Sequence, residues 1–271
     1  MQQELVSIIM PSFNARRYVA DSIESILGQT YTNWELLITD DHSTDGTQDI
    51  LRSYAERDMR IRIFLMKENW GTGHTRNKSL QEARGRYIAF CDSDDRWLPE
   101  KLERQIKFMQ QHGHAFTFAS YYTCNEEGDT NGIVIAPDRQ TLINTKRDDK
   151  IGFLTAVYDT QQCPKLFMPT LRKRQDWAYV LMIHQHVGDA HALREPLGIY
   201  RLHNGSVSHN KFSLVRFNAA VYREVFGYSK FQSFAYLFTF FLPTYFAKRV
   251  RNRIDRHRYR QMWKDAPILT H

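Results

Sequence analysis

Short apolar runs alternate with amphipathic segments through the first third of the chain. The runs lie at residues 6–10, 34–39, 61–65 and 87–91, and their β-branched, leucine and aromatic residues favour strands. Between them, apolar positions recur at helical spacing, as at 18, 19, 23, 26 and 27. Strands that alternate with helices predict an α/β fold with a doubly wound, mostly parallel sheet and right-handed connections.

Polar loops follow these strands, at residues 11–14, 40–43, 71–76 and 92–95. Open α/β sheets bind their ligands at the carboxyl ends of the strands. We therefore expect the functional side chains to lie in these loops.

The pattern becomes less regular beyond residue 97. It predicts an amphipathic helix at 98–111, a strand at 116–122, an apolar helix at 178–186 and a strand at 197–203. Residues 125–150 are polar and rich in turn formers, which predicts a variable loop.

The strand at 87–91 runs directly into three carboxylates, Asp92, Asp94 and Asp95. Like charges packed at a strand end destabilise a fold unless a cation joins them. A divalent cation with oxygen ligands is the expected partner, and such cations also hold substrate phosphates. For Asp95 a second interpretation stands beside this one, in which it caps a helix that begins near Trp97.

Composition narrows the class of protein. The chain has 271 residues, which permits one large domain or one domain with an appendage, and its hydrophobic content of 42% is enough for a sizeable core. Its three cysteines stand at unrelated spacings, which predicts neither a disulfide framework nor a zinc site and fits a reducing compartment. The first five residues are acidic and unlike a signal peptide.

The net charge of +7 is concentrated near the C-terminus. Residues 231–247 carry no charge and are rich in Phe and Tyr, but Pro243 interrupts a run already short for a membrane span. A basic cluster follows, with Asp255 as its only acid: Lys248, Arg249, Arg251, Arg253, Arg256, Arg258 and Arg260. We expect this region to lie on an anionic membrane surface. The alternative is a helical appendage packed on the catalytic domain, and the two can coexist.

Several short motifs, taken in order, resemble the inverting family 2 glycosyltransferases. They are the strand ending in Pro11-Ser12-Phe13-Asn14, residues 29–35, residues 40–47, residues 71–77, Asp92-Ser93-Asp94-Asp95 before Trp97-Leu98-Pro99, and Tyr200-Arg201-Leu202-His203 before Ser206-Val207-Ser208. The resemblance covers about residues 6–211. It implies the GT-A fold, a Rossmann-like nucleotide-sugar-binding domain.

The resemblance also implies the donor site. Pro11, Ser12 and Phe13 would contact the nucleotide base, and Asp41 would accept a hydrogen bond from the uracil N3–H. Arg76 would approach the phosphates. Asp92-Ser93-Asp94 would be the DxD motif, in which Asp92 and Ser93 face the nucleotide and Asp92 and Asp94 face Mn²⁺ or Mg²⁺. His203 would approach the metal or the diphosphate.

Asp176 would be the general base that takes the proton of the acceptor hydroxyl. Relatives often carry Glu before this position, whereas this chain has Gln175, so an acceptor contact of that Glu is in doubt. The alternative is a purely structural role, in which Asp176 only caps the helix that it begins.

The expected function is metal-dependent, inverting transfer of a hexose or N-acetylhexosamine from a UDP-sugar to a glycan or polyprenyl-diphosphate-linked acceptor, in surface polysaccharide biosynthesis. Residues 1–210 would be the catalytic domain and 211–271 a helical segment that packs on it or associates with membrane. The expected location is the inner face of the cytoplasmic membrane. An inactive nucleotide-sugar-binding scaffold is the alternative. The basic C-terminus also suggests nucleic acid, but no nucleic-acid-binding motif accompanies it.

Overall fold

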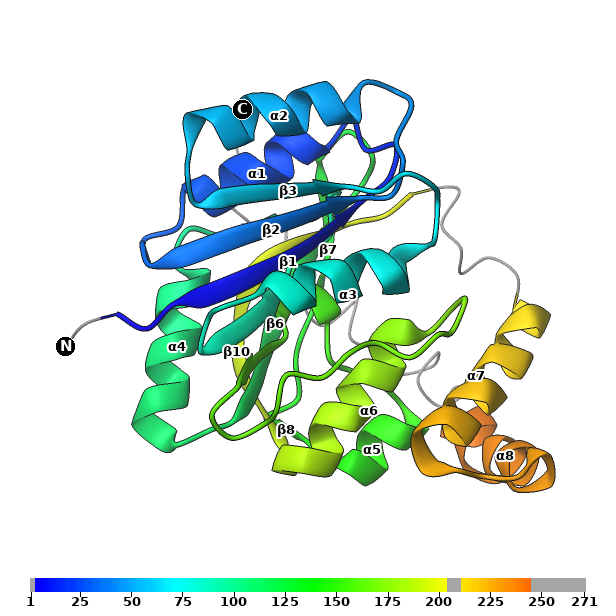
Figure 1. The fold of residues 1–271 in the computed structure, drawn as a ribbon. Coiled ribbons are helices and arrows are strands. Elements are labelled where there is room, and N and C mark those ends of the chain that lie inside the picture. Colours follow the sequence, from blue (N-terminus) through cyan, green and yellow to red (C-terminus); the bar gives the residue numbers. More distant parts are fainter. Residues whose placement is uncertain (1–2, 204–210, 245–271) are drawn as a thin grey trace.

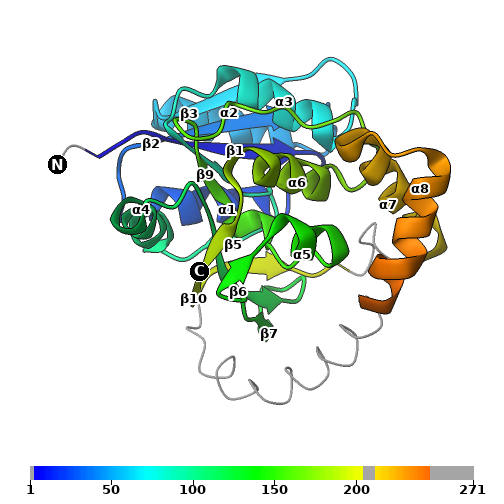
Figure 2. The same cartoon turned by 90° about the horizontal axis from the view of Figure 1, so that it is seen from below.

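The computed structural model describes residues 3–203 and 211–244. Within them a ten-stranded sheet crosses the molecule, with helices on both faces (Figures 1 and 2). Its order is β3-β2-β1-β4-β9-β6-β10-β5, with β7 paired to β6 and β8 to β10. The strands are β1 (Val6–Ser12), β2 (Trp34–Asp40), β3 (Ile61–Leu65), β4 (Tyr87–Phe90), β5 (Arg96–Trp97), β6 (Phe116–Cys124), β7 (Thr130–Val134), β8 (Arg139–Gln140), β9 (Val157–Asp159) and β10 (Ala190–Arg201).

The first four strands confirm the predicted parallel sheet. β1 pairs with β2 and with β4, and β2 pairs with β3, all in parallel. The helices between them are α1 (Val19–Leu27), α2 (Thr47–Arg57) and α3 (Thr72–Glu82). Alternate residues of β1 enter opposite cores: Ile8 packs in the cluster that contains α1 and α2, and Ile9 in the cluster that contains α3. Both faces are covered, which explains why these strands read as continuous apolar runs.

The second half of the sheet is mixed. β9 lies antiparallel between β4 and β6, while β10 runs parallel to β6 and antiparallel to β5. The two longer helices of this half are α4 (Lys101–His112), which joins the core that contains α1, and α6 (Gln175–Val187), which joins the core that contains α3.

The variable loop predicted at 125–150 is wrong. That segment contains β7, β8 and α5 (Leu142–Arg147). β7 pairs antiparallel with β6, and Gly132 allows the close approach because a Cβ there would lie 2.8 Å from the Thr123 hydroxyl. Elements of two to six residues are too short to show a period in the sequence.

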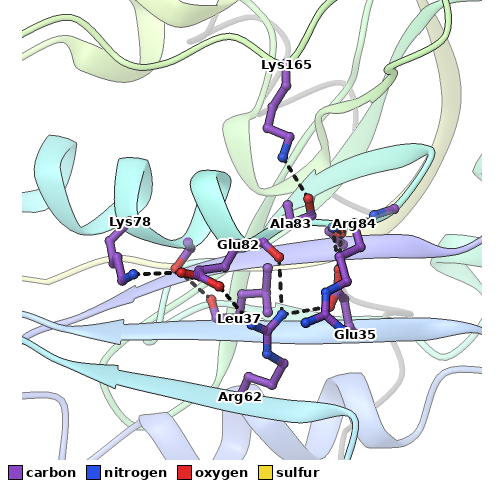
Figure 3. A network of polar contacts seen from close by, with 11 residues as sticks. Glu35, Leu37, Arg62, Lys78, Glu82, Ala83, Arg84 and Lys165 are labelled. Atoms are coloured by element: carbon purple, nitrogen blue, oxygen red, sulfur yellow. Dashed lines mark hydrogen bonds and ion pairs between the residues drawn. The ribbon is translucent and has the colours of Figure 1, made fainter.

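A network of charged side chains fixes the C-terminal end of α3 to the sheet (Figure 3). Arg62 of β3 donates to the Glu82 carboxylate at 2.9 Å and to Glu35 of β2 at 3.3 Å. Lys78 donates to the other Glu82 oxygen at 2.7 Å. Because this end is anchored, the opposite end of α3 has a defined position at the carboxyl edge of the sheet.

The C-terminal helices confirm the expected helical appendage with an aromatic cluster. They are α7 (Lys211–Phe226), α8 (Lys230–Tyr236) and a π-helical turn (Leu237–Phe241), and they lie beside α5 and α6 in both views (Figures 1 and 2). Trp177 of α6 forms a core cluster with Tyr222 of α7 and with Leu237. Lys146 of α5 is nearly buried there, donates to the Tyr228 hydroxyl at 2.6 Å and stands over three aromatic rings.

One face of the appendage remains uncovered. Phe231 is 82% exposed and Phe238 is 60% exposed. Within the described residues, no helix combines the length and the apolar character that crossing a membrane requires. The basic cluster at 248–260 and the motif at 206–208 lie outside the described residues.

Candidate functional site

The predicted acidic motif lies directly after β4, at the carboxyl edge of the sheet. Asp92 is held by Arg76 of α3, whose Nη2 donates to both carboxylate oxygens at 2.6 and 2.8 Å. Arg76 is buried and its guanidinium lies over the Phe153 ring, 4.9 Å from the centroid. Its Nε has no hydrogen-bond partner among the described residues. Arg76 therefore presents a buried cation with an unused donor beside the motif.

Asp94 pairs with His203, which follows β10. His203 Nε2 lies 2.7 Å from Asp94 Oδ2, and the His203 ring contacts Tyr18. Burial raises the pKa of the Asp94 carboxyl and the Asp92 charge adds to the rise, while His203 opposes it. The site therefore disfavours two adjacent carboxylate charges and would be stabilised by a bound cation.

Asp95 is structural, but it is not a helix cap. Residues 96–97 form β5, and α4 begins at Lys101 with Glu100 as its N-cap. The Asp95 carboxylate instead accepts the backbone N–H of Arg201 at 3.1 Å, and the Arg201 side chain donates to Asp94 O at 3.1 Å. Burial raises the pKa of Asp95 well above its usual range. Asp95 and Arg201 thus join the end of β10 to the motif and place His203 beside Asp94.

The expected nucleotide residues lie at the neighbouring ends of β1 and β2. Pro11 pairs with Thr39 and Ser12 with Asp40 in the parallel register, and Phe13 is half exposed. The buried Ser12 hydroxyl has no hydrogen-bond partner among the described residues.

Asp41 organises the loop that leads into α3. Its two carboxylate oxygens accept the backbone N–H groups of Trp70 and Gly71, each at 2.8 Å. A carboxylate oxygen can accept a second hydrogen bond, so these contacts leave capacity for a ligand. The sequence assigned Asp41 to the uracil and missed this second role. The glycine at position 71, which adopts φ +85° in the structure, is the sequence signal of a tight loop there.

Asp176 stands in the first turn of α6, and the capping interpretation is wrong. The N-cap is Arg174, in the left-handed conformation at φ 68°, and it makes no side-chain cap. Asp176 is half buried, and its Oδ1 accepts the N–H of Trp177 at 2.8 Å. Its position in the first turn also places the carboxylate near the positive end of the helix dipole.

The first turns of α3 and α6 lie together. A Cβ at Gly73 would lie 3.3 Å from the Gln175 side chain. Asn77 of α3 also holds the segment before α6, since its amide donates to Met168 O at 2.9 Å and accepts from Met168 N–H at 2.6 Å. Sequence reasoning missed Gly73 and Asn77. Helix α3 contacts the acidic motif through Arg76, and through Gly73 it contacts Gln175 of α6, the helix that carries Asp176.

The part of the chain that the structure describes contains no preformed metal-binding site. There, no group of three or more His, Cys, Asp or Glu side chains is arranged to hold an ion. Asp94 and His203 are paired and Asp92 is engaged by Arg76, so two carboxylates and an imidazole face the same edge. The carboxylate oxygens of Asp92 and Asp94 are ligands of the kind that Mg²⁺ takes together with phosphate and water, whereas the imidazole is not an oxygen ligand.

Comparison with known proteins gives consistent results. Residues 7–168 match the family described as Glycosyl transferase family 2. The chain is 41% identical over 222 residues to a putative teichuronic acid biosynthesis glycosyltransferase, TuaG, of Bacillus subtilis (strain 168), covering 82% of this chain and 88% of that protein. It is 36% identical over 212 residues to WfgD of Escherichia coli, named a UDP-Glc:alpha-D-GlcNAc-diphosphoundecaprenol beta-1,3-glucosyltransferase, covering 78% and 83%.

Solved structures share the fold at lower identity. S. aureus TarS in complex with UDP-GlcNAc aligns with a TM-score of 0.66 at 19% identity, over 85% of this chain and 69% of that one. The mannosyltransferase PcManGT of Pyrobaculum calidifontis, in complex with GDP-Man and Mn²⁺, aligns with a TM-score of 0.59 at 17% identity, over 84% and 64%. These likenesses confirm the GT-A fold. With the match over residues 7–168 and the identity to bacterial transferases, they show that the chain belongs to glycosyl transferase family 2.

Proposed function

We propose that this transferase moves a hexose or N-acetylhexosamine from a UDP-sugar to a hydroxyl of a glycan or lipid-linked acceptor, with inversion, in surface polysaccharide biosynthesis. One observation carries the proposal. The Arg76–Asp92 and His203–Asp94 pairs stand at one edge of the sheet, and α3 links them to α6, whose first turn holds Asp176. This arrangement supports the proposal, because it would put groups for the leaving phosphate and for the attacking hydroxyl on adjoining elements.

Unused polar atoms support the donor assignment. Ser12 Oγ and Arg76 Nε are buried without a hydrogen-bond partner among the described residues, a state that costs about 1–3 kcal/mol per group unless a ligand satisfies it. Asp41 retains acceptor capacity for the uracil N3–H. The fold relative TarS is known with UDP-GlcNAc and the E. coli relative is named for UDP-Glc, which favours UDP over other nucleotides.

The diphosphate leaves with considerable negative charge. Asp92, Asp94 and His203 would hold Mn²⁺ or Mg²⁺, which when bound supplies positive charge to the departing phosphates. Arg76 supplies a fixed cation to the same oxygens, and its burial strengthens that interaction. Mn²⁺ in the structure of the distant relative PcManGT agrees with this assignment.

Asp176 accepts the proton of the acceptor hydroxyl as that oxygen attacks the anomeric carbon. A single displacement from the face opposite UDP breaks the bond to the diphosphate and inverts the configuration. The Asp176 carboxylate accepts the Trp177 N–H in the first turn of α6, which fixes its position at the start of that helix. Asp176 therefore orients and deprotonates the acceptor, while Arg76 and the acidic motif stabilise the leaving group.

The acceptor and the membrane belong to the same proposal. The E. coli relative is named for a diphosphoundecaprenol-linked acceptor, which resides in a membrane. The exposed phenylalanines of α8 and the basic residues at 248–260 would hold residues 211–271 on an anionic surface at the inner face of the cytoplasmic membrane. Residues 1–210 would then be the catalytic domain.

The test is a panel of UDP-hexoses and UDP-N-acetylhexosamines with the purified full chain, with and without Mn²⁺. Metal-dependent release of UDP from one donor is expected. UDP calorimetry on the wild type and on Asp41→Ala tests the nucleotide site, where a loss of about 1–3 kcal/mol is expected. UDP binding without turnover of any donor would favour the inactive scaffold. Absence of UDP binding would refute both the transferase and the scaffold hypotheses.

A further inference from the structure

A pocket of about 420 Å³ opens between the first turns of α3 and α6, and the roles proposed above leave it unassigned. Its lining includes Trp70 and His74 on the α3 side, and Arg172 and Gln175 on the α6 side. None of the lining residues that the structure describes is an Asp or a Glu. The pocket is thus neutral to cationic, although it adjoins a site rich in carboxylates.

The walls of this pocket are fixed by contacts already made in the protein. The paired Asn77–Met168 hydrogen bonds hold the segment before α6 against α3. Gln175 lies over Gly73, where any side chain would press on it. Asp41 holds the backbone of Trp70 and Gly71. Because its walls are held from three directions, the pocket is preformed and does not depend on a ligand to open it.

The uncharged part of the lining suits a pyranose ring. Trp70 is 57% exposed, so its indole offers a free apolar surface to the C–H face of a sugar. The amides of Asn69 and Gln175 line the same pocket, and each carries donors and an acceptor for hydroxyl groups. An aromatic platform with neutral amides around it matches the two kinds of surface that a sugar presents.

The charged part suits a phosphate. Arg172 lines the pocket and begins a run of three cations, Arg172-Lys173-Arg174. The N-terminal ends of α3 and α6 both border the space, and each places the positive end of a helix dipole there. A guanidinium can bind phosphate oxygens in a bidentate manner. Arg172, not the helix ends alone, gives the pocket a specific anion contact.

We propose that this pocket is the acceptor subsite, which holds the terminal pyranose of a diphosphate-linked acceptor against Trp70 and its anomeric phosphate at Arg172. The inference rests on the proposed function, which supplies a sugar acceptor and a base. Gln175 lines the pocket and directly precedes Asp176, so the pocket adjoins the first turn of α6, which carries the proposed base, although Asp176 itself is not in the lining. Gln175 is uncharged, so it places no carboxylate beside this phosphate.

Binding alone gives the first test. A short-chain alkyl diphosphate ester of N-acetylglucosamine is titrated by calorimetry into the full chain saturated with UDP, so that the donor site is already filled. Arg172→Gln should weaken binding of this probe at least about tenfold, because a charge-assisted phosphate contact is lost. Trp70→Ala should weaken it by a similar factor and leave UDP affinity unchanged. Arg52→Gln, an exposed arginine of α2, is the matched control and should bind as the wild type does.

Transfer kinetics separate the two halves of the subsite. For an acceptor with the diphosphate, KM should rise in both variants. For an alkyl N-acetylglucosaminide that lacks the diphosphate, KM should rise in Trp70→Ala but not in Arg172→Gln. If the probe does not bind the UDP-saturated chain, or binds both variants like the wild type, the pocket is not the acceptor subsite. Hydrolysis of UDP-sugar without acceptor reports separately on the proposed function, because it requires no acceptor site.

Discussion

His203 and Asp94 meet at 2.7 Å although 109 residues separate them in the chain. This contact depends on the hydrogen bond between Asp95 and Arg201. Asp95 accepts the backbone N–H of Arg201 and so fixes the end of β10, which His203 follows. The imidazole thereby becomes part of the acidic motif. A lone histidine in a sequence is usually structural, and here only the sheet order brings it to the carboxylates.

Asp94→Ala should lower turnover on the order of 10²–10³-fold, because the departing diphosphate loses a fixed electrostatic partner. The remaining activity should no longer respond to Mn²⁺. Turnover against Mn²⁺ concentration is the measurement, with Asp49→Ala, an exposed carboxylate of α2, as control. Full activity of Asp94→Ala in EDTA would exclude the metal assignment.

Asp176→Asn keeps the size of the side chain and an oxygen for the Trp177 N–H, but it removes the basicity. Transfer should fall by roughly 10²–10⁴-fold, the usual contribution of a positioned base. UDP affinity should not change, since Asp176 lies on α6 and outside the expected nucleotide contacts. Single-turnover transfer with parallel UDP calorimetry distinguishes the two effects, and normal transfer would assign the base to another carboxylate.

Lys101 should make the free energy of unfolding depend on pH. It is fully buried, its Nζ has no hydrogen-bond partner among the described residues, and burial lowers its pKa to about 7. The unfolded chain, with a pKa of about 10.4, then binds more protons than the folded chain between about pH 7 and 10. Stability should therefore rise with pH across that window, by up to about 1.4 kcal/mol per unit.

Urea unfolding at several pH values measures this dependence. In Lys101→Met the rise should disappear, and the variant should gain stability chiefly near and below pH 7, where the wild type carries a buried ammonium. Lys107→Met, exposed on the same helix, should keep the slope of the wild type. An unchanged slope in Lys101→Met would mean that the lysine titrates at its ordinary pKa.

The membrane proposal needs surface substitutions instead of truncation. Deletion after Tyr228 would remove Leu237, which packs with Trp177, and so would expose part of a core. Phe231→Ser with Phe238→Ser changes exposed side chains only, and it should reduce flotation with anionic liposomes at low salt. High salt should reduce flotation further, because it screens the attraction between the basic residues and the anionic lipids, which contributes about 1 kcal/mol per residue near the surface.

Met59→Ser, which changes an exposed apolar residue far from the appendage in sequence, is the control for that experiment. It should float as the wild type does. If the full chain does not float with anionic liposomes at low salt, the C-terminal helices are only a packed appendage.

The sequence by itself determined the parallel half of the fold and the identity of the acidic motif. Strands β1, β2 and β4 are buried on both faces, the edge strand β3 is partly buried, and all four alternate with helices, so local pattern and final topology agree. Asp92 and Asp94 follow from the sequence because a strand end is a local feature, whereas the roles of Asp41 and Asp176 are implied by the family resemblance. Their ligands remain predictions.

Only the tertiary structure decided the rest. The direction of β9 and β10, the short elements within 125–150 and the pairing of Asp95 with Arg201 depend on contacts between distant segments. The pocket between α3 and α6 exists because Asn77 reaches Met168, 91 residues away, and because Gly73 leaves room for Gln175. Such contacts carry no period and no local signature, since their energy comes from packing and hydrogen bonding that form when the chain is folded.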